Sequence, residues 1–392
     1  MPETLLGDDV IVSSGASQVV SMQVIPKRSV YILFGSSINA RTASSARIRN
    51  YRNNFDKKKY QVEVRSLQDY KLFKRFELAF KDVLVARFFL EFVFSVLIAL
   101  KILIESNRDA IVLVSSPPFF LTLSGLIISK FSNRLVVYDI RDLYPHVFLW
   151  KGVLSGSSPV YKLMFKLASA AYRDKICICA TKGINRYVEL DFLCQCACLY
   201  LNGSSLPRAD SRLDKLKNER TFTVIIHGTL GRLQNQDYLY KLMENCPKVK
   251  FKIFTDRQRL NVQKFDVLNN VIISDRISPD KLGAEIRKSH LLISLRDESN
   301  LTALANPVKV FDSLSQGTPS IIMPHSEILS HVGSSTLLKA FNYDEFSGLV
   351  AFVNRCQQDF GFYRSSFPEF GFGCGDVERP QKLPEAVIEA LK

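Results

Sequence analysis

The stretch SVYILFGSS, residues 29–37, decides which class of fold the chain adopts. Five consecutive apolar residues from Val30 onward are typical of a strand buried on both faces, and Gly35-Ser36-Ser37 ends it in a loop of small residues. A helical pattern over 40–55 and a second strand pattern over 60–64 follow. Because parallel strands need a crossover between them, this β-α-β order predicts a parallel sheet covered by helices.

The same alternation of strands and helices continues along the rest of the chain. Further strands are expected at 110–115, 134–139, 175–180, 222–226, 250–254, 271–274, 291–295 and 319–323. At 392 residues the chain exceeds the usual size of one hydrophobic core. We therefore predict an α/β protein of two Rossmann-like parallel-sheet domains.

Changes in composition predict where these domains begin and end. A turn-forming run from Asn202-Gly203 and a polar stretch up to Arg220 separate the two series of strands. We expect a leader without clear periodicity over 1–27, an N-terminal domain over 28–203, a C-terminal domain over 204–350, and a tail over 351–392 that packs back on the N-terminal domain. The tail pattern indicates a helix, an irregular stretch at 360–375 and a short helix at 384–391.

Charge is distributed unevenly along the chain. The formal net charge is +14, and the first 200 residues carry 27 Lys and Arg against 16 Asp and Glu. Such a basic half suits an anionic membrane, nucleic acid or an acidic substrate, or is simply a solvated surface. The chain has no recognisable nucleic-acid-binding module, which argues against nucleic acid as a partner.

The eight cysteines stand singly or in C-x-C steps, which is not the spacing of a zinc site. In a chain of this length without a secretory signal at its start, we expect reduced thiols and a cytosolic compartment.

An apolar stretch over 78–104 is long enough to cross a bilayer. Charged residues interrupt it, and a charge near the centre of a spanning helix is costly. They are Lys81, Asp82, Arg87, Glu91 and Lys101. We therefore expect one or two helices packed on the sheet, with contact between part of them and a membrane surface as the alternative.

Polar residues follow three strands of the first half, and ligands of open parallel sheets bind beyond the carboxyl ends of strands. Gly35 lets a backbone come close to a phosphate or sugar, with an ordinary turn as an equal alternative. Ser116 precedes two prolines, which make a rigid turn or a helix start. The loop VYDIRDLYP holds a cluster that either orients and deprotonates an acceptor hydroxyl or forms an internal ion network. Its members are Asp139, Arg141 and Asp142.

The segment HGTLGR, residues 227–232, follows the first strand of the second half. Gly228 and Gly231 open its backbone. Arg232 stands at the start of the next helix, where a guanidinium matches phosphate oxygens and opposes the helix dipole unless an anion is near.

The segment NPVKVFD, residues 306–312, begins another helix at Asn306. Lys309 and Asp312 share one face of this helix. A cation for a diphosphate and a carboxylate for ribose hydroxyls fit there, and a surface ion pair is the alternative.

In their order along the chain, these segments resemble family 4 glycosyltransferases of GT-B architecture, especially the branch that builds bacterial capsule and O-antigen polysaccharides. The similar segments are SSPP, DIRDLYP, the Asn-Gly linker, HGTLGRLQNQD, LISLRDES and NPVKVFDSLSQGTPSII. The resemblance spans 29–350 and is strongest over 222–323. It implies two domains facing a central cleft and a retaining transfer of a sugar from a nucleotide-diphosphate donor, without a metal ion or other cofactor.

The resemblance also implies roles for single residues. Arg232 and Lys309 take the diphosphate-binding positions and stabilise the leaving group. Asp312 stands where the family usually has a ribose-binding glutamate, and Leu304 replaces the first glutamate of the family's E-x7-E pattern. The expected donor site is Gly35, Gly228, Gly231, Arg232, Asn306, Lys309 and Asp312. The expected acceptor site is Ser116, Arg141 and Asp142, and the expected catalytic residues are Asp139, Asp142, Arg232 and Lys309.

In this branch the acceptor is typically a saccharide on a polyprenyl diphosphate. A basic N-terminal half then implies a cytoplasmic enzyme, peripheral at the inner face of an anionic membrane. The basic residues expected near anionic headgroups or the acceptor diphosphate are Arg41, Arg47, Arg49, Arg52 and Lys57–Lys59. Because the glutamate pattern is incomplete, a catalytically silent GT-B partner subunit of a glycosyltransferase complex is the alternative. A sugar-nucleotide epimerase fits less well, since no histidine stands beside a carboxylate pair placed for that chemistry.

Overall fold

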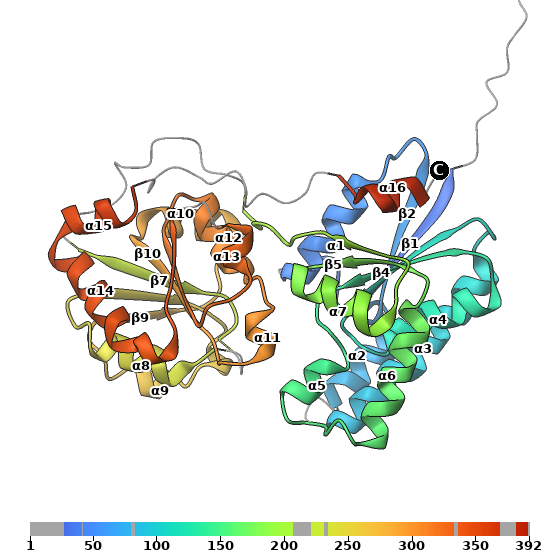
Figure 1. The fold of residues 1–392 in the computed structure, drawn as a ribbon, viewed down its shortest axis with the longest axis horizontal. Helices are drawn as coiled ribbons and strands as arrows, with labels where there is room; N and C mark the ends of the chain where they lie inside the picture. Colours follow the sequence, from blue (N-terminus) through green and yellow to red (C-terminus); the bar gives the residue numbers. More distant parts are fainter. Residues whose placement is uncertain are drawn as a thin grey trace, which may run out of the picture.

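The computed structural model describes residues 27–40, 42–79, 83–206, 221–230, 234–332, 336–368 and 382–390. These residues form two α/β domains, blue to green and yellow to red in Figure 1, each built on a six-stranded parallel sheet. The strand order is β2-β1-β3-β4-β5-β6 in the N-terminal sheet and β12-β11-β10-β7-β8-β9 in the C-terminal sheet. The predicted α/β class with two parallel-sheet domains is confirmed.

The N-terminal sheet contains the apolar run 30–34, which forms most of its strand β1. Its strands are β1 (Arg28–Phe34), β2 (Tyr60–Ser66), β3 (Ile111–Ser116), β4 (Leu135–Ile140), β5 (Ile176–Cys179) and β6 (Cys196–Leu199). Its helices are α1 (Ala43–Asn54), α2 (Lys71–Ala79), α3 (Leu84–Glu105), α4 (Leu121–Phe131), α5 (His146–Trp150), α6 (Pro159–Tyr172) and α7 (Lys182–Phe192), with a 3-10 turn η1 (Leu67–Asp69). Ile32 of β1 lies in one core cluster with Ile48 of α1, and Leu33 lies in the other with Ile98 of α3. Both faces of β1 are therefore covered.

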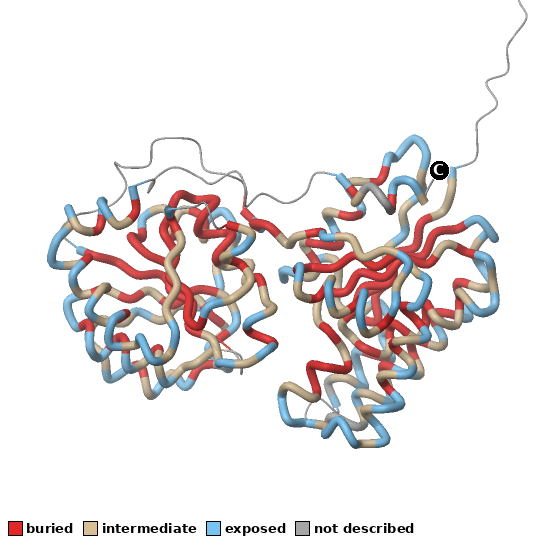
Figure 2. The backbone as a smooth tube through the Cα atoms, viewed as in Figure 1, coloured by how far each residue is buried: buried red, intermediate tan, exposed pale blue. Residues whose placement is uncertain are grey.

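The C-terminal domain repeats this plan. Its strands are β7 (Thr223–His227), β8 (Lys250–Phe254), β9 (Val271–Ser274), β10 (Leu291–Leu295), β11 (Ser320–Met323) and β12 (Leu338–Ala340). Its helices are α8 (Gln236–Glu244), α9 (Val262–Phe265), α10 (Pro279–Lys288), α11 (Asn300–Ala303), α12 (Val308–Ser315), α13 (Ile328–His331), α14 (Phe346–Gln358) and α15 (Phe360–Ser366), with 3-10 turns η3 (Arg257–Arg259) and η4 (Tyr343–Glu345). In both domains the central strands are buried and the helices carry the exposed surface, as Figure 2 shows.

Several elements were not predicted, namely β6, β12, α5, α7, α9, α11 and α13, and one prediction is wrong. The edge strands β6 and β12 are short and only partly buried, so their sequences carry little periodicity, and α7 also went unrecognised. Residues 360–366 form α15 instead of an irregular stretch. The Asp359 side chain accepts from the N–H of Phe362 at 2.9 Å, and the buried Tyr363 donates to the carbonyl oxygen of His290 at 2.8 Å. This tertiary contact stabilises a helix that propensity alone does not favour.

The end of the chain returns to the N-terminal domain. Helix α16 (Glu385–Ala390) lies beside α1 and β2 in Figure 1. Leu383 and Val387 are buried in the same core cluster as Ile48 of α1.

The apolar stretch over 78–104 falls at the end of α2 and along α3. Among the described residues, no helix is long and apolar enough to cross a membrane. Seven cysteines of the described segments are free thiols, and Cys374 lies outside those segments.

Candidate functional site

Loops at the carboxyl ends of the two sheets contact each other. The Glu327 carboxylate, beyond β11, accepts from the backbone N–H groups of Lys182 and Gly183 at the start of α7, at 2.7 Å from Gly183. A Cβ atom on Gly183 would lie 2.2 Å from Leu304 Cδ2 and 2.7 Å from a Glu327 oxygen. With any other residue at position 183, one of these two side chains would have to move. Because ligands of parallel sheets bind beyond the carboxyl ends of the strands, this junction is where a site is expected.

Four residues of the C-terminal domain hold buried polar atoms at this edge of the sheet. Within the part of the chain that the structure describes, these atoms have no hydrogen-bond partner: Nε2 of His227, Nη1 of Arg296, Nδ2 and Oδ1 of Asn306, and Nζ of Lys309. His227 ends β7, Arg296 follows β10, and Asn306 and Lys309 flank the start of α12. A buried polar group without a partner costs about 1–3 kcal/mol, and more when it is charged. The cluster is therefore suited to an anionic, oxygen-rich ligand.

The electrostatics of this cluster follow from the same burial. Burial, assisted by the nearby Arg296, lowers the pKa of Lys309 to about 7. Burial and Lys309 together lower the pKa of His227 to about 3, so the imidazole is neutral. Burial also lowers the pKa of Arg296, and the carboxylate of Asp142 in the N-terminal domain is the first charge that opposes this shift. Two cationic groups thus lie close together in a dry site, with Asp142 across the domain junction.

Gly228 lets the loop after β7 run close to Lys309. Its φ is +90°, which favours glycine, and a Cβ atom there would lie 3.9 Å from Lys309 Cε. Its backbone is fixed by Thr255, whose Oγ1 donates to the Gly228 carbonyl oxygen at 2.8 Å. Gly231 and Arg232, predicted in the same loop, lie outside the described residues.

The Asp312 carboxylate is engaged inside the protein. It accepts from the backbone N–H of Ser205 at 2.5 Å, from Ser205 Oγ at 2.8 Å and from Ser204 Oγ at 3.0 Å. These serines belong to the segment that connects β6 to the C-terminal domain. Asp312 is buried, and it fastens this connection to α12. Its role toward a ribose stays a prediction.

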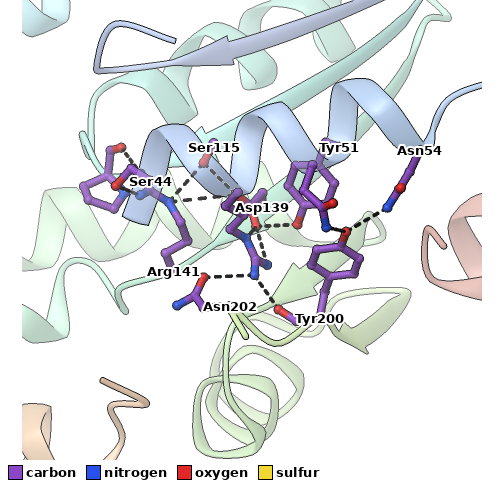
Figure 3. A network of polar contacts seen from close by, with 11 residues as sticks. Ser44, Tyr51, Asn54, Ser115, Asp139, Arg141, Tyr200 and Asn202 are labelled. Atoms are coloured by element: carbon purple, nitrogen blue, oxygen red, sulfur yellow. Dashed lines mark hydrogen bonds and ion pairs between the residues drawn. The ribbon is translucent and has the colours of Figure 1, made fainter. Parts of the chain in front are cut away.

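Asp139 lies at the centre of a buried network, drawn in Figure 3. Arg47 approaches its Oδ1 with Nε at 2.8 Å and Nη2 at 2.7 Å, and both side chains are inaccessible. Tyr51 donates to Oδ1 at 2.9 Å and Ser115 donates to Oδ2 at 2.6 Å. Burial opposes the charge of Arg47, but Asp139 together with Tyr51 and Tyr200 more than offsets it, so the pKa of the guanidinium is raised. This is the arrangement of a structural ion pair, and Asp139 has no surface to offer a substrate in this conformation.

Arg141 holds the loop after β3 in place. Its guanidinium donates to Ser115 Oγ at 3.2 Å, to the Pro117 carbonyl oxygen at 2.9 Å and to Ser44. The loop is also closed by Gly35, where a Cβ atom would lie 2.3 Å from Pro118 Cδ.

The predicted acceptor residues differ in how far they are exposed. Ser116 is buried and Arg141 is bound to its own domain, whereas Asp142 is half-buried and is close enough to influence Arg296. Of the predicted acceptor residues, Asp142 therefore lies best to meet a ligand at the domain junction.

Sequence reasoning brought Asn306 and Lys309 together and missed His227 and Arg296. His227 and Arg296 both lie at the end of a strand that was predicted. Because ligands bind beyond the carboxyl ends of parallel strands, their positions alone made them candidate site residues. In the described residues, no three His, Cys, Asp or Glu side chains are grouped to hold a metal ion.

The architecture is the GT-B fold, with two parallel-sheet α/β domains in one chain. Among solved structures it matches unliganded OtsA, with a TM-score of 0.63 and 12% identity over 93% of this chain and 99% of that chain. It matches sucrose-phosphate synthase from Thermosynechococcus elongatus, at 0.63 and 11% over 87% and 92% of the two chains. It matches HepE from Anabaena in complex with UDP-glucose, at 0.58 and 12% over 88% and 93%. No protein-family model and no curated protein sequence matches, and identities this low show the fold alone.

The Lys309 ammonium makes a pH dependence of anion binding testable. A pKa of about 7 means that the unliganded amine is largely neutral at higher pH, so an anion that binds the ammonium must then bind together with a proton. UDP serves as the probe anion. We expect the affinity for UDP to fall by up to about tenfold per pH unit above 7. His227, with a pKa of about 3, stays neutral across this range.

Titration calorimetry in two buffers of different ionisation enthalpy measures the proton uptake directly. The terminal phosphate of UDP is about 90% ionised at pH 7 and more so above it, since second phosphate pKa values lie near 6. Equal affinity and no proton uptake between neutral and alkaline pH would contradict the assignment.

Proposed function

We propose that the protein is a glycosyltransferase that takes a sugar from a nucleotide-diphosphate donor and transfers it to a saccharide acceptor. The observation that carries this proposal is the set of buried polar atoms on His227, Arg296, Asn306 and Lys309 that have no hydrogen-bond partner among the described residues. A diphosphate supplies the negative charge and the acceptor oxygens that the nitrogen atoms of these groups lack. Bound UDP-glucose in HepE, a protein of the same fold, supports this choice of ligand.

In the proposed reaction the bond between the sugar C1 and the diphosphate oxygen breaks, and a bond between C1 and the acceptor oxygen forms. Lys309 and Arg296 stabilise the charge that develops on the leaving diphosphate, together with the predicted Arg232. The acceptor hydroxyl loses its proton, and we propose that Asp142 accepts it from the N-terminal side. We further propose that the reaction retains the configuration at C1 and needs no metal ion.

The acceptor we propose is a lipid-linked saccharide of cell-surface polysaccharide synthesis, on a polyprenyl diphosphate. The protein would then act at the inner face of a membrane as a peripheral cytoplasmic enzyme. Support comes from the basic N-terminal half, since anionic lipids attract clustered Lys and Arg.

A donor screen tests the proposed function. UDP-, GDP- and dTDP-sugars are added one at a time, and melting temperature is measured, followed by release of the nucleoside diphosphate with a lipid-linked acceptor. At a donor concentration a hundred times its Kd, binding stabilises the fold by about 2.7 kcal/mol, which is readily seen. No stabilisation by any donor would overturn the proposal. Binding without transfer or hydrolysis would favour the alternative of a catalytically silent partner subunit.

A further inference from the structure

Helix α3 is apolar on two opposite faces. Its inner face packs on the N-terminal core through Phe94, Ile98 and Ile102. Its outer face carries large apolar side chains at three- to five-residue intervals, from Phe89, which is 66% exposed, to Ile104, which is 83% exposed. The exposed members of this outer row are Phe89, Phe92, Leu97, Leu100 and Ile104. A contiguous row of this kind is unusual on a surface that faces only water.

Helix α2 packs beside α3 and adds both apolar and cationic groups. Its buried Phe73 stacks edge to face on Phe94 of α3, with ring centroids 5.2 Å apart, and so fixes α2 on the domain. The exposed side chains of α2 include two apolar groups, Leu72 and Phe76. They also include three cations, Lys71, Lys74 and Arg75. The one acid among its described side chains is Glu77, which is half-buried and accepts from Gln68.

This combination of groups fits the surface of a lipid bilayer. Spanning is excluded for α3, because charged residues such as Arg87 and Lys101 interrupt it and no described helix meets the length and polarity of a membrane span. An apolar row flanked by Lys and Arg is the pattern of a helix that lies in the membrane interface. The cations complement anionic headgroups, and the aromatic and aliphatic side chains suit the acyl boundary below them.

The α2 end of this surface lies at the carboxyl edge of the N-terminal sheet, the edge whose loops contact the C-terminal domain. Strand β2 ends at Ser66, η1 follows directly, and α2 begins at Lys71, so α2 starts at the carboxyl edge of the N-terminal sheet. Ser66 Oγ donates to the carbonyl oxygen of Ser36 at 2.6 Å, which joins this corner to the loop of Gly35. A ligand that is anchored in a bilayer at α2 would therefore be held at the edge of the sheet that contacts the C-terminal domain.

We propose that the exposed faces of α2 and α3 form a docking surface for an anionic phospholipid bilayer, with Phe89, Phe92 and Leu97 inserted and Lys71, Lys74 and Arg75 on the headgroups. The inference deepens the proposed function, on which it rests for its purpose of presenting a lipid-linked acceptor. It adds to the surface expected from sequence, of which Arg52 and Lys57–Lys59 are exposed and stay a prediction. Arg47 is buried in an ion pair, and Arg49 donates to the carbonyl oxygens of Ile38 and Ala40, so these arginines do not form a free basic patch. Arg41 lies outside the described residues.

Sedimentation with vesicles tests the apolar part of this surface. The full chain is mixed with phosphatidylcholine vesicles that either contain or lack phosphatidylglycerol, and the bound fraction is measured. We expect binding only to the anionic vesicles, with a loss of about tenfold or more in the partition coefficient for Phe89→Ser/Phe92→Ser, because each inserted side chain contributes to partitioning. Val267→Ser/Ile272→Ser removes two exposed apolar groups from the C-terminal domain and should leave binding unchanged.

A second pair of variants tests the charges. Lys74→Gln/Arg75→Gln should lower vesicle binding by about tenfold or more, since each cation near an anionic surface contributes about 1 kcal/mol. Lys248→Gln/Lys281→Gln makes the same change in net charge on the C-terminal domain and should have little effect. Wild-type protein that fails to pellet, or equal losses in test and control variants, would overturn the proposal.

Two further readouts separate this proposal from its rivals. Donor-induced thermal stabilisation should survive in Phe89→Ser/Phe92→Ser, so loss of vesicle binding with retained donor binding supports the docking surface independently of the transfer reaction. If the wild-type protein binds the donor but does not bind vesicles, the docking surface is contradicted and the proposed function is not. A wild-type dimer that becomes a monomer in the serine variant, measured by light scattering without vesicles, would assign the face to a second copy of the chain instead.

Discussion

Replacement of Lys309 by methionine is expected to abolish donor binding without weakening the fold. Methionine keeps most of the volume of the side chain but removes an ammonium that is buried and has no partner in the described structure. If this ammonium binds the diphosphate, transfer should fall by about a hundred- to a thousandfold, as when one group that stabilises a developing anion is removed. Donor-induced thermal stabilisation should disappear with it.

The stability of the same variant has a pH dependence with a defined sign. Lys309 has a pKa of about 7 in the folded chain and an ordinary value of 10.5 when exposed. The unfolded chain therefore binds a proton between these values that the folded chain lacks, and the wild type gains stability as pH rises through this window. Lys309→Met removes this penalty. The variant should melt at or above the wild-type temperature near pH 7, and the difference should vanish towards pH 10.5.

A matched control comes from a lysine of the same domain that has a partner. Lys252 pairs with Glu285 at 2.8 Å, away from the cluster, so Lys252→Met should lose a little stability and keep donor binding. Donor binding at wild-type affinity in Lys309→Met, or a large loss of melting temperature, would remove Lys309 from the site.

The sequence made the fold and half of the buried polar cluster, Asn306 and Lys309, predictable for the same reason. In a parallel sheet that is covered on both faces, each buried strand appears in the sequence as a continuous apolar run. These runs show where the strands end, and ligands bind at those ends. Asn306 and Lys309 stood out because they begin a helix beside such an end. His227 and Arg296 stand at equally predictable ends, yet a single polar residue there does not reveal that its nitrogen is buried without a partner, since burial depends on what the other segments cover.

The same dependence on distant segments explains why the role of Asp139 could not be predicted. The sequence offered two readings of this residue, a catalytic base or a member of an ion network, and Arg47 is 92 positions away along the chain. No local sequence pattern predicts an ion-pair partner at that separation along the chain. Asp312 is similar, because the serines that bind it come from the segment between the domains.

The largest loss of stability is expected from Asp139→Asn. The substitution leaves Arg47 buried without a counter-charge, and breaking a buried ion pair from one side costs about 3–5 kcal/mol. Arg47→Met should cost less, because the carboxylate keeps the hydroxyls of Tyr51 and Ser115 and lies 3.9 Å from Arg141. The double variant Arg47→Met/Asp139→Asn should recover part of the loss, since neither charge is then left alone.

Urea unfolding followed by tryptophan fluorescence measures these differences in the right domain. The single tryptophan of the chain, Trp150, lies in α5 of the N-terminal domain, so its signal reports on the unfolding of the sheet that contains Asp139. Arg65→Met is the control. Arg65 pairs with Glu63 at 2.6 Å and Glu105 at 2.9 Å near the surface of the same domain, and losing such pairs costs about 0–1 kcal/mol. If Asp139→Asn instead kept its stability and lost transfer, the carboxylate would act in the reaction rather than in the fold.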